Sequence, residues 1–169
     1  MNAQLQAPTT HWKNDLWVCD HHQLNVTVSY IPYLGASSEK IVRPWLTVWQ
    51  DFHSRKIVGH FIHQSRTVSY DTIFITLYAA CDVHGTPKRV HIDDGKNYVD
   101  GAIKEFCTPL GIERSLVLGV ATKPTERFFQ AVDEKFCKTF AAEQALPIKE
   151  FSKRFTAWLE ASQYAAEVK

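Results

Sequence analysis

Three carboxylates in this sequence occupy positions from which they could act on one ligand. Asp20 lies in a run of β-branched and aromatic residues, Asp93 ends a short apolar run, and Glu126 opens a helical pattern. Carboxylates without a paired histidine or cysteine ligand form a hard oxygen donor set, which suits Mg²⁺ or Mn²⁺. If folding brings the three together, the sequence predicts a divalent-metal site.

Asp20 shares its strand alternation with apolar residues, so a regular strand would aim its carboxylate along the apolar face. An unpaired buried carboxylate is costly, and pairing or metal binding relieves that cost. A bulge that returns Asp20 to solvent, or pairing with His21, His22 or an arginine, is the alternative. Asp15 and Asp51 compete for the same role, and strand parity favours Asp20.

The other two acids also have plainer interpretations when each is taken alone. Asp93 and Asp94 precede Gly95, and Asp with Gly suits an ordinary turn. Glu126 stands in the first helical turn, where the helix dipole stabilises any carboxylate. Only the joint arrangement of the three acids raises the metal-site interpretation above these alternatives.

Composition describes an ordinary globular chain with little net charge. The 169 residues are 45% hydrophobic and 22% charged, which is enough for one domain with its own core. The formal net charge of +1 argues against binding nucleic acid through bulk charge, so any basic surface must be local.

Cysteine spacing and hydropathy favour a reducing, membrane-free location. The four cysteines lack the close spacing of a zinc site, so we expect reduced, buried thiols. No apolar run is long enough to cross a bilayer, and the N-terminus lacks a secretion-signal pattern. These features indicate a cytoplasmic protein with no membrane partner.

Periodicity predicts an alternation of strands and helices. We expect a polar lead-in at residues 1–15, a core at 16–146, and a C-terminal amphipathic helix at 147–169 that leads to a further domain. The predicted elements are strands at 16–28, 45–52 and 56–63, a helix from the Ser69 cap to Gly85, a strand at 89–92, a helix closed by Gly111, a strand at 114–117, a helix from near Thr125 that Pro147 breaks, and a last helix that packs on the core.

This order predicts an α/β fold with a mixed five-stranded sheet and helices on both faces. A three-stranded antiparallel meander is extended by two strands that arrive through crossover helices. Few common architectures share the order, and it is the order of the ribonuclease H-like fold. In that fold, carboxylates from the first strand, the fourth strand and a later helix meet around metal ions.

Several segments carry a resemblance to a known family. Residues 122–129, TKPTERFF, closely resemble the KPxER segment of bacteriophage Mu transposase and its relatives in the DDE transposase and retroviral integrase superfamily. Residues 93–96, DDGK, are similar to the DNG(K/R) signature, although Asp94 replaces the usual Asn. Residues 43–47 (RPWLT) and 54–59 (SRKIVG) resemble the intervening strands. Either Asp93 or Asp94 could be the second acid, and the register favours Asp93.

The resemblance implies a transposase catalytic core. Asp20, Asp93 and Glu126 would be catalytic acids that hold two Mg²⁺ or Mn²⁺ ions about 4 Å apart, with Asp20 between them. Water as nucleophile would nick DNA at a transposon end, and the freed 3′-hydroxyl would then join target DNA. The implied partners are double-stranded DNA, as transposon ends and target, and further copies of the chain that assemble on it, in the bacterial cytoplasm at the nucleoid.

Basic residues near the acids could form a local cationic rim for phosphates. Lys123 and Arg127 flank Glu126, while Lys88 and Lys96 lie near the second aspartate in sequence. Each could equally be a solvated surface side chain. The segment 118–124 could be a mobile flap or a plain connector.

The histidine pairs do not predict zinc. Adjacent strand residues, such as His21 and His22, point to opposite faces, and so do residues three apart, such as His60 and His63.

Two other functions remain open at this stage. A ribonuclease H-like hydrolase would cut nucleic acid without joining it. A transposase-derived DNA-binding or assembly module would keep the fold without catalysis.

Overall fold

A five-stranded mixed sheet forms the centre of the protein in the computed structural model, which describes residues 12–34, 37–65, 69–92, 103–115, 123–140 and 145–166. The strand order is β5-β4-β1-β6-β7. Strands β1, β4 and β5 are antiparallel, while β6 pairs with β1, and β7 with β6, in parallel. The strands are β1 (Leu16–Gln23), β4 (Trp45–Asp51), β5 (Ile57–His63), β6 (Arg89–Ile92) and β7 (Glu113–Arg114).

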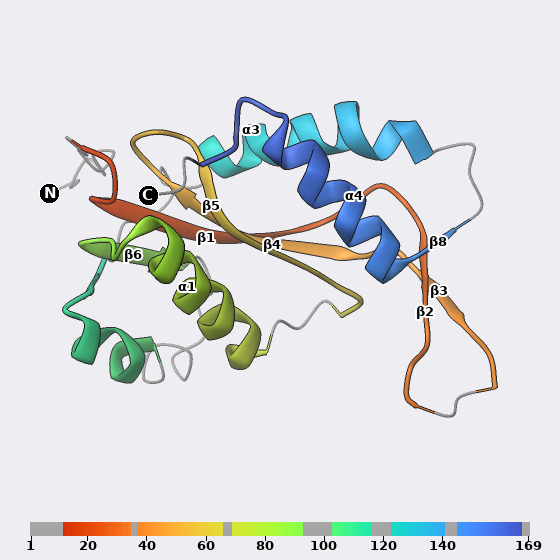
Figure 1. Ribbon diagram of the computed structural model, residues 1–169, viewed down its shortest axis with the longest axis horizontal. Coiled ribbons are helices and arrows are strands. Elements are labelled where there is room, and N and C mark those ends of the chain that lie inside the picture. Colours follow the sequence, from red (N-terminus) through yellow and green to blue (C-terminus); the bar gives the residue numbers. More distant parts are fainter. Residues whose placement is uncertain are drawn as a thin grey trace, which may run out of the picture.

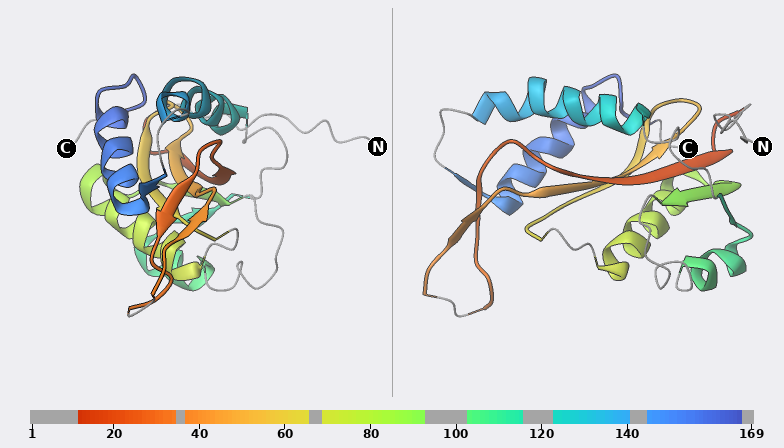
Figure 2. Two further views of the ribbon diagram at one scale, coloured as in Figure 1. Left: turned by 90° about the vertical axis from the view of Figure 1, so that its right-hand side faces the viewer. Right: turned by 180° about the vertical axis from the view of Figure 1, so that it is seen from behind.

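Helices cover both faces of this sheet (Figure 1). Helix α1 (Tyr70–His84) lies on one face, and α3 (Lys123–Ala131) and α4 (Ile148–Glu160) lie on the other, as the rear view in Figure 2 also shows. The predicted meander, crossover strands and two-sided helical cover are therefore confirmed. No helix among the described residues is both long and apolar enough to cross a membrane.

Alternate residues of the strands pack into two separate hydrophobic cores, one on each face of the sheet. Trp17 and Cys19 of β1 pack in a cluster with Leu77 of α1. Leu46 and Val48 of β4 pack on the other face with aromatic residues of α3 and α4. This alternation follows from the two-residue period of a strand, and it decides which face each polar side chain of β1 reaches.

Helix α1 begins and ends where the sequence predicts. The Ser69 hydroxyl accepts a hydrogen bond from the Thr72 N–H, and Gly85, with φ of 84°, provides the C-cap. Gly59 of β5 lets this helix approach closely, since a Cβ there would lie 3.1 Å from the Thr76 carbonyl oxygen.

The segment between β6 and β7 also follows the prediction. Residues 103–107 are helical, a 3₁₀ turn follows over Thr108–Leu110, and Gly111 ends it in the left-handed conformation with φ of 68°. Of the predicted strand at 114–117, Arg114 lies in β7 (Glu113–Arg114) and Ser115 follows this strand, while residues 116 and 117 lie outside the described residues.

Helix α3 continues through irregular turns into the aromatic core. A π-helical turn spans Val132–Phe136, and a 3₁₀ turn follows over Cys137–Phe140. The predicted apolar stripes of the two last helices are buried together, which confirms that the C-terminal helix packs on the core: Phe129, Val132, Phe136, Phe140, Phe151, Phe155 and Leu159. The domain boundary predicted at residue 147 remains a prediction.

The prediction of one strand over residues 16–28 is wrong, because β1 ends at Gln23 and a second sheet begins at Val28. Opposite Leu24 stands Pro44, which accepts a hydrogen bond from the Leu24 N–H but has no N–H to return. The Arg43 Nε donates to the Leu24 carbonyl instead, at 3.1 Å. The ladder therefore breaks here, and the hairpin bends away from the main sheet.

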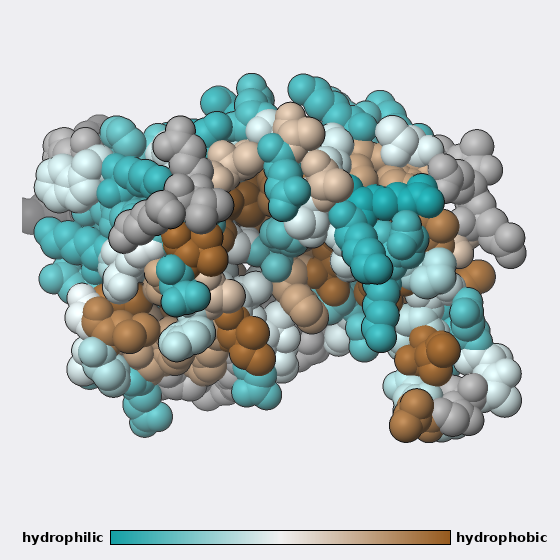
Figure 3. Space-filling model, in the orientation of Figure 1, coloured by the Kyte–Doolittle hydropathy of each residue, from teal (hydrophilic) through white to brown (hydrophobic). Residues whose placement is uncertain are grey.

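The second sheet has the order β3-β2-β8 and projects from the body (Figure 2). Its strands are β2 (Val28–Tyr30), β3 (Lys40–Val42) and β8 (Leu146–Pro147). The hairpin and the start of α4 line an open groove of about 430 Å³. Figure 3 shows apolar side chains at the far end of the hairpin, where the exposed residues include Ile31, Tyr33, Leu34 and Ile41.

Candidate active site

The Asp20 carboxylate is half-buried and held from two sides. Its Oδ2 accepts a hydrogen bond from the Thr125 hydroxyl at 2.7 Å, and its Oδ1 accepts one from the His21 backbone N–H at 2.7 Å. The pairing of β1 with β4 runs without a shift through Asp20, which faces Val48 in the register. A bulge that returns Asp20 to solvent is therefore not what this strand contains, and the carboxylate points toward α3.

The start of α3 meets β1 at this carboxylate. Thr125 is fully buried, and Phe128 and Phe129 on the same helix are buried against the sheet. Glu126 is exposed and follows Thr125 directly in the first turn of the helix. Thr125 of this first turn donates to the Asp20 carboxylate. The structure thus places the helical turn that carries Glu126, the third predicted acid, next to Asp20, the first predicted acid.

Strand β6 ends beside the same place. Its last residue, Ile92, is the parallel partner of Cys19, the neighbour of Asp20 in β1. Asp93, Asp94 and Lys96 lie outside the described residues, and so do residues 118–122 of the possible flap at 118–124. The meeting point of β1, β6 and α3 is therefore defined by described residues on all three elements.

The two competing aspartates are engaged in structural contacts. Asp15 is buried and pairs with the Arg89 guanidinium at 2.8 Å. Asp51 is buried at the β4–β5 turn, where it accepts hydrogen bonds from the backbone N–H groups of Asn14 and Ser54 at 2.7 and 2.6 Å. In the register Asp51 faces Trp17, three residues before Asp20 on β1. These contacts account for both acids without a metal.

Two arginines converge near the start of α3. Arg127 is exposed on the helix, and Arg55 in the β4–β5 turn lies over the Phe52 ring at 4.3 Å from its centre. Burial lowers the pKa of Arg55, the charge of Arg127 lowers it further, and Asp51 opposes both effects. Arginine side chains are cationic, so the two form a local positively charged surface. Sequence reasoning did not single out Arg55, because one basic residue in a short turn carries no distinctive pattern.

Two of the predicted lysines, Lys88 and Lys123, lie within the described residues, and they are at different ends of the sheet. Lys123 is the first residue of α3, next to the candidate site. Lys88 precedes β6, at the opposite end of that strand from Ile92, where its N–H donates to the Asn14 carbonyl. A DNA-binding role for Lys88 and Lys123 remains a prediction.

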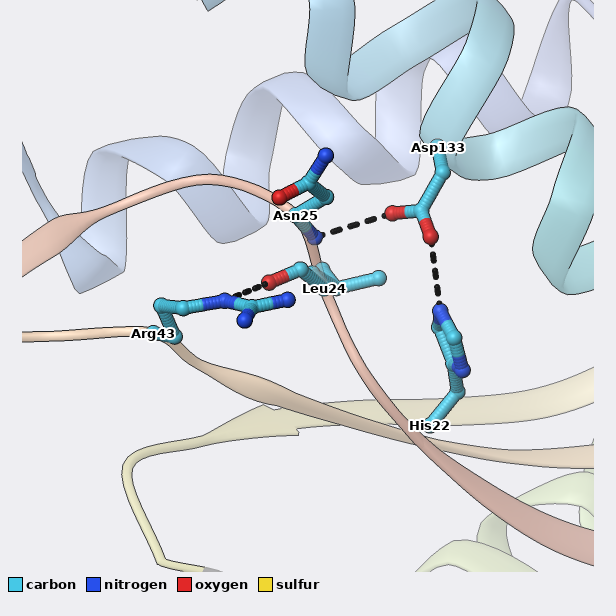
Figure 4. Close-up of polar contacts among 5 residues, drawn as sticks. All are labelled: His22, Leu24, Asn25, Arg43 and Asp133. Atoms are coloured by element: carbon cyan, nitrogen blue, oxygen red, sulfur yellow. Dashed lines mark hydrogen bonds and ion pairs between the residues drawn. The ribbon is translucent and has the colours of Figure 1, made fainter.

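Next to the site, a side-chain hydrogen bond joins His22 of β1 to Asp133 of the π-helical turn. The His22 Nε2 lies 2.7 Å from Asp133 Oδ2, and Asp133 Oδ1 accepts the Asn25 N–H at 2.9 Å (Figure 4). The His22 ring stacks on Phe129. His22 and Asp133 are 111 positions apart, so nothing in the local sequence could have predicted their contact.

Within each predicted pair, His21 with His22 and His60 with His63, the two side chains contact different partners, as strand geometry predicts. His21 and His63 both bond the Thr47 hydroxyl, at 3.0 and 2.9 Å, whereas His60 bonds Thr156 of α4. Burial lowers the pKa of His63 to about 4, and the nearby His21 acts in the same direction. Across the described residues, no group of three His, Cys, Asp or Glu side chains is arranged to hold a metal ion.

All four cysteines are free thiols in the interior, as predicted. Cys19, Cys107 and Cys137 are buried, and Cys81 is half-buried. Burial raises the pKa of Cys137 to about 12, with Asp133 adding to the effect. A thiol with a pKa raised in this way is a poor nucleophile, so Cys137 suits packing in the core.

Three features together define the ribonuclease H-like fold. They are a meander whose first strand carries a carboxylate, a parallel strand that ends beside this carboxylate, and a helix that starts against it. Similarity to solved structures shows the same fold. The catalytic core domain of BIV integrase matches with a TM-score of 0.60 at 12% identity, over 88% of this chain and 82% of that chain. The HTLV-2 integrase catalytic core in complex with magnesium matches with a TM-score of 0.55 at 21% identity, over 83% and 81%.

A third structure, the simian T-cell lymphotropic virus intasome in complex with PP2A regulatory subunit B56 gamma, matches with a TM-score of 0.59 at 19% identity, over 95% of this chain and 54% of that chain. In sequence, the chain is 29% identical over 136 residues to the transposase for transposon Tn552 of Staphylococcus aureus. That match covers 73% of this chain, which spans about a quarter (26%) of the length of this curated relative. No protein-family model matches.

The predicted resemblance to DDE transposase and integrase cores is confirmed by these comparisons, in sequence by a transposase and in fold by integrase cores. The narrower resemblance to the transposase of phage Mu remains a prediction.

Proposed function

We propose that this chain is the catalytic core of a DDE transposase, which nicks DNA at transposon ends and transfers the resulting 3′-hydroxyl into target DNA. The observation that carries the proposal is the hydrogen bond between Thr125 and Asp20, which joins the strand of the first acid to the helix turn of the third. The similarity to a transposase in sequence and to integrase cores in fold supports it.

The donor set fits a divalent cation. Asp20 is half-buried and aimed at α3, and Glu126 is exposed in the first turn of that helix. Since β6 ends beside Cys19, the chain leaves the strand next to Asp20, and we propose Asp93 as the second ligand. Carboxylate oxygens are the ligands that Mg²⁺ and Mn²⁺ prefer, so Asp20, Asp93 and Glu126 would hold the ions, two by family resemblance.

The bound ions would supply Lewis-acid stabilisation of the charge that develops on the scissile phosphate. The chain itself contributes position and charge. Hydrogen bonds fix the Asp20 carboxylate, and α3 fixes the backbone of Glu126. Arg127, with Lys96 and Lys123, would attract the DNA backbone to the site. A water molecule as nucleophile yields a nick, whereas a DNA 3′-hydroxyl yields a joined strand.

The proposed partners are double-stranded DNA, as transposon ends and target, and further copies of the chain that assemble on it. We also propose a bacterial cytoplasmic location at the nucleoid, where such DNA is found. The low net charge of +1 is compatible with these partners because cationic side chains gather locally at the start of α3.

A plasmid-joining assay tests the proposed reaction. The purified chain is incubated with Mn²⁺, a supercoiled plasmid and a labelled duplex that carries a free 3′-hydroxyl. We expect the label to become covalently attached to the plasmid, and Asp20→Asn to abolish both joining and nicking. Nicking without joining would indicate a hydrolase. Neither reaction with the wild-type chain, together with wild-type behaviour of Asp93→Asn in the longer protein, would indicate a module without catalysis.

A further inference from the structure

Thr125 combines complete burial with a hydrogen bond to a candidate metal ligand. Its side chain is 0% exposed, and its hydroxyl donates to Asp20 Oδ2 at 2.7 Å across 105 positions of sequence. A valine has nearly the same shape and would fill the same space with no polar atom to satisfy. The hydroxyl is therefore what this position adds beyond packing, and its acceptor is the carboxylate of the candidate site.

We propose that Thr125 is a positioning residue, which fixes the orientation of the Asp20 carboxylate for metal binding; this inference rests on the proposed function. A carboxylate can rotate about two side-chain bonds, and a single hydrogen bond would leave part of that freedom. Here the two oxygens are held by different elements, Oδ1 by the His21 N–H of β1 and Oδ2 by Thr125 of α3. The plane of the carboxylate is consequently set before any ion binds.

The hydrogen bond is compatible with a metal ion on the same carboxylate. Each carboxylate oxygen has two acceptor positions, so a bond from Thr125 does not exclude coordination at Oδ2. Hydrogen-bond partners of metal ligands orient those ligands, and their removal typically weakens metal affinity about 10- to 100-fold. Thr125 also couples the two halves of the site, because a helix displaced from β1 would lose this bond and move Glu126 away.

Mn²⁺ binding to the full 169-residue chain, measured from the electron paramagnetic resonance signal of the free ion, tests the inference. We expect Thr125→Val to weaken Mn²⁺ affinity at least about tenfold, and Thr125→Ser, which keeps the hydroxyl, to retain near wild-type affinity. Thr76→Val is the matched control, because Thr76 is a buried helical threonine on the other side of the sheet whose hydroxyl donates to the Ile73 carbonyl. We expect this control to bind Mn²⁺ like the wild type.

The outcomes separate the positioning role from the proposed function. Wild-type affinity in Thr125→Val, with binding lost in Asp20→Asn, would overturn the role of Thr125 and leave the metal site intact. Wild-type affinity in Asp20→Asn would overturn the proposed site itself. Equal weakening by Val and Ser would show that losing the hydroxyl is no worse than losing the methyl group, so the hydroxyl would have no special role, which also overturns the inference. If Thr125→Val does not fold, Thr125→Ser and Thr125→Ala, which differ in the hydroxyl alone, give the same comparison.

Discussion

Neighbouring side chains of β1 point to opposite faces of the sheet, so this one strand contributes both to the candidate site and to the polar contacts on the other face. Asp20 reaches the α3 face and accepts hydrogen bonds from Thr125 and its own neighbour. His21, one residue on, reaches the other face and shares the Thr47 hydroxyl with His63. Because burial lowers the pKa of His63, this second face is sensitive to pH.

The buried His63 should make stability fall in mild acid. Its pKa in the folded chain is about 4, below the ordinary 6.5, so between these values the unfolded chain binds a proton that the folded chain does not. Stability is therefore complete above pH 6.5 and is lost as pH falls toward 4. Burial also lowers the pKa of His60, which adds a loss of the same sign.

Urea unfolding at pH 7 and pH 4.5 measures this loss. Between the two values, we expect the wild type to lose about 2 kcal/mol more unfolding free energy than His63→Gln, which removes the titrating group. His53→Gln, at an exposed turn position, serves as control and should show the wild-type loss. Equal losses in all three proteins would contradict the assignment to His63.

At the scale of elements, Asp133 links the end of β1 to the helix that begins at the candidate site. It pairs with His22 and accepts the Asn25 N–H at the point where the chain leaves the main sheet. We expect Asp133→Ala to lower the unfolding free energy by about 1–3 kcal/mol, because the half-buried His22 ring and the Asn25 N–H both lose their hydrogen-bond partner. Urea denaturation provides the measurement.

The exposed pair between Glu150 and Arg154 on α4 is the matched control for Asp133. Glu150→Ala should cost no more than about 0.5 kcal/mol, since exposed helical ion pairs contribute little. Comparable losses in the two variants would show that the link between β1 and α3 is no stronger than a surface contact.

The elements also show which parts of the fold a sequence can predict. Local signals are sufficient for α1, because the Ser69 cap and Gly85 lie at its ends. They are insufficient for the end of β1, which depends on Pro44 across the ladder and on Asp133, a distant residue. The side on which Asp20 lies follows from strand alternation, whereas its contact with Thr125 has no local signature. The joint action of the three acids was predicted through family resemblance and remains to be tested.

At the scale of the whole molecule, the net charge is near neutral, so the proposed DNA binding would depend on local cationic side chains. The formal net charge is +1, and Arg55 and Arg127 are close enough for their charges to interact at the start of α3. We expect Arg127→Ala to weaken binding to random duplex DNA and to reduce the slope of log affinity against log salt by about 1, as loss of one phosphate contact requires. Fluorescence anisotropy across a salt series gives both quantities.

Arg154→Ala is the control for that experiment, because Arg154 is an exposed arginine on α4 that pairs with Glu150. It should leave the salt slope unchanged. If both variants reduce the slope equally, DNA is attracted by the overall charge of the molecule and not by the surface around α3.

The central claim is that carboxylates from β1, the end of β6 and the start of α3 share divalent cations. A crystal structure of the chain soaked in Mn²⁺, with anomalous diffraction data, tests it most directly. The account predicts anomalous peaks with oxygens of Asp20, Asp93 and Glu126 within about 2.5 Å. Peaks only at other positions, or ordered side chains of these three residues turned to separate surfaces, would contradict it.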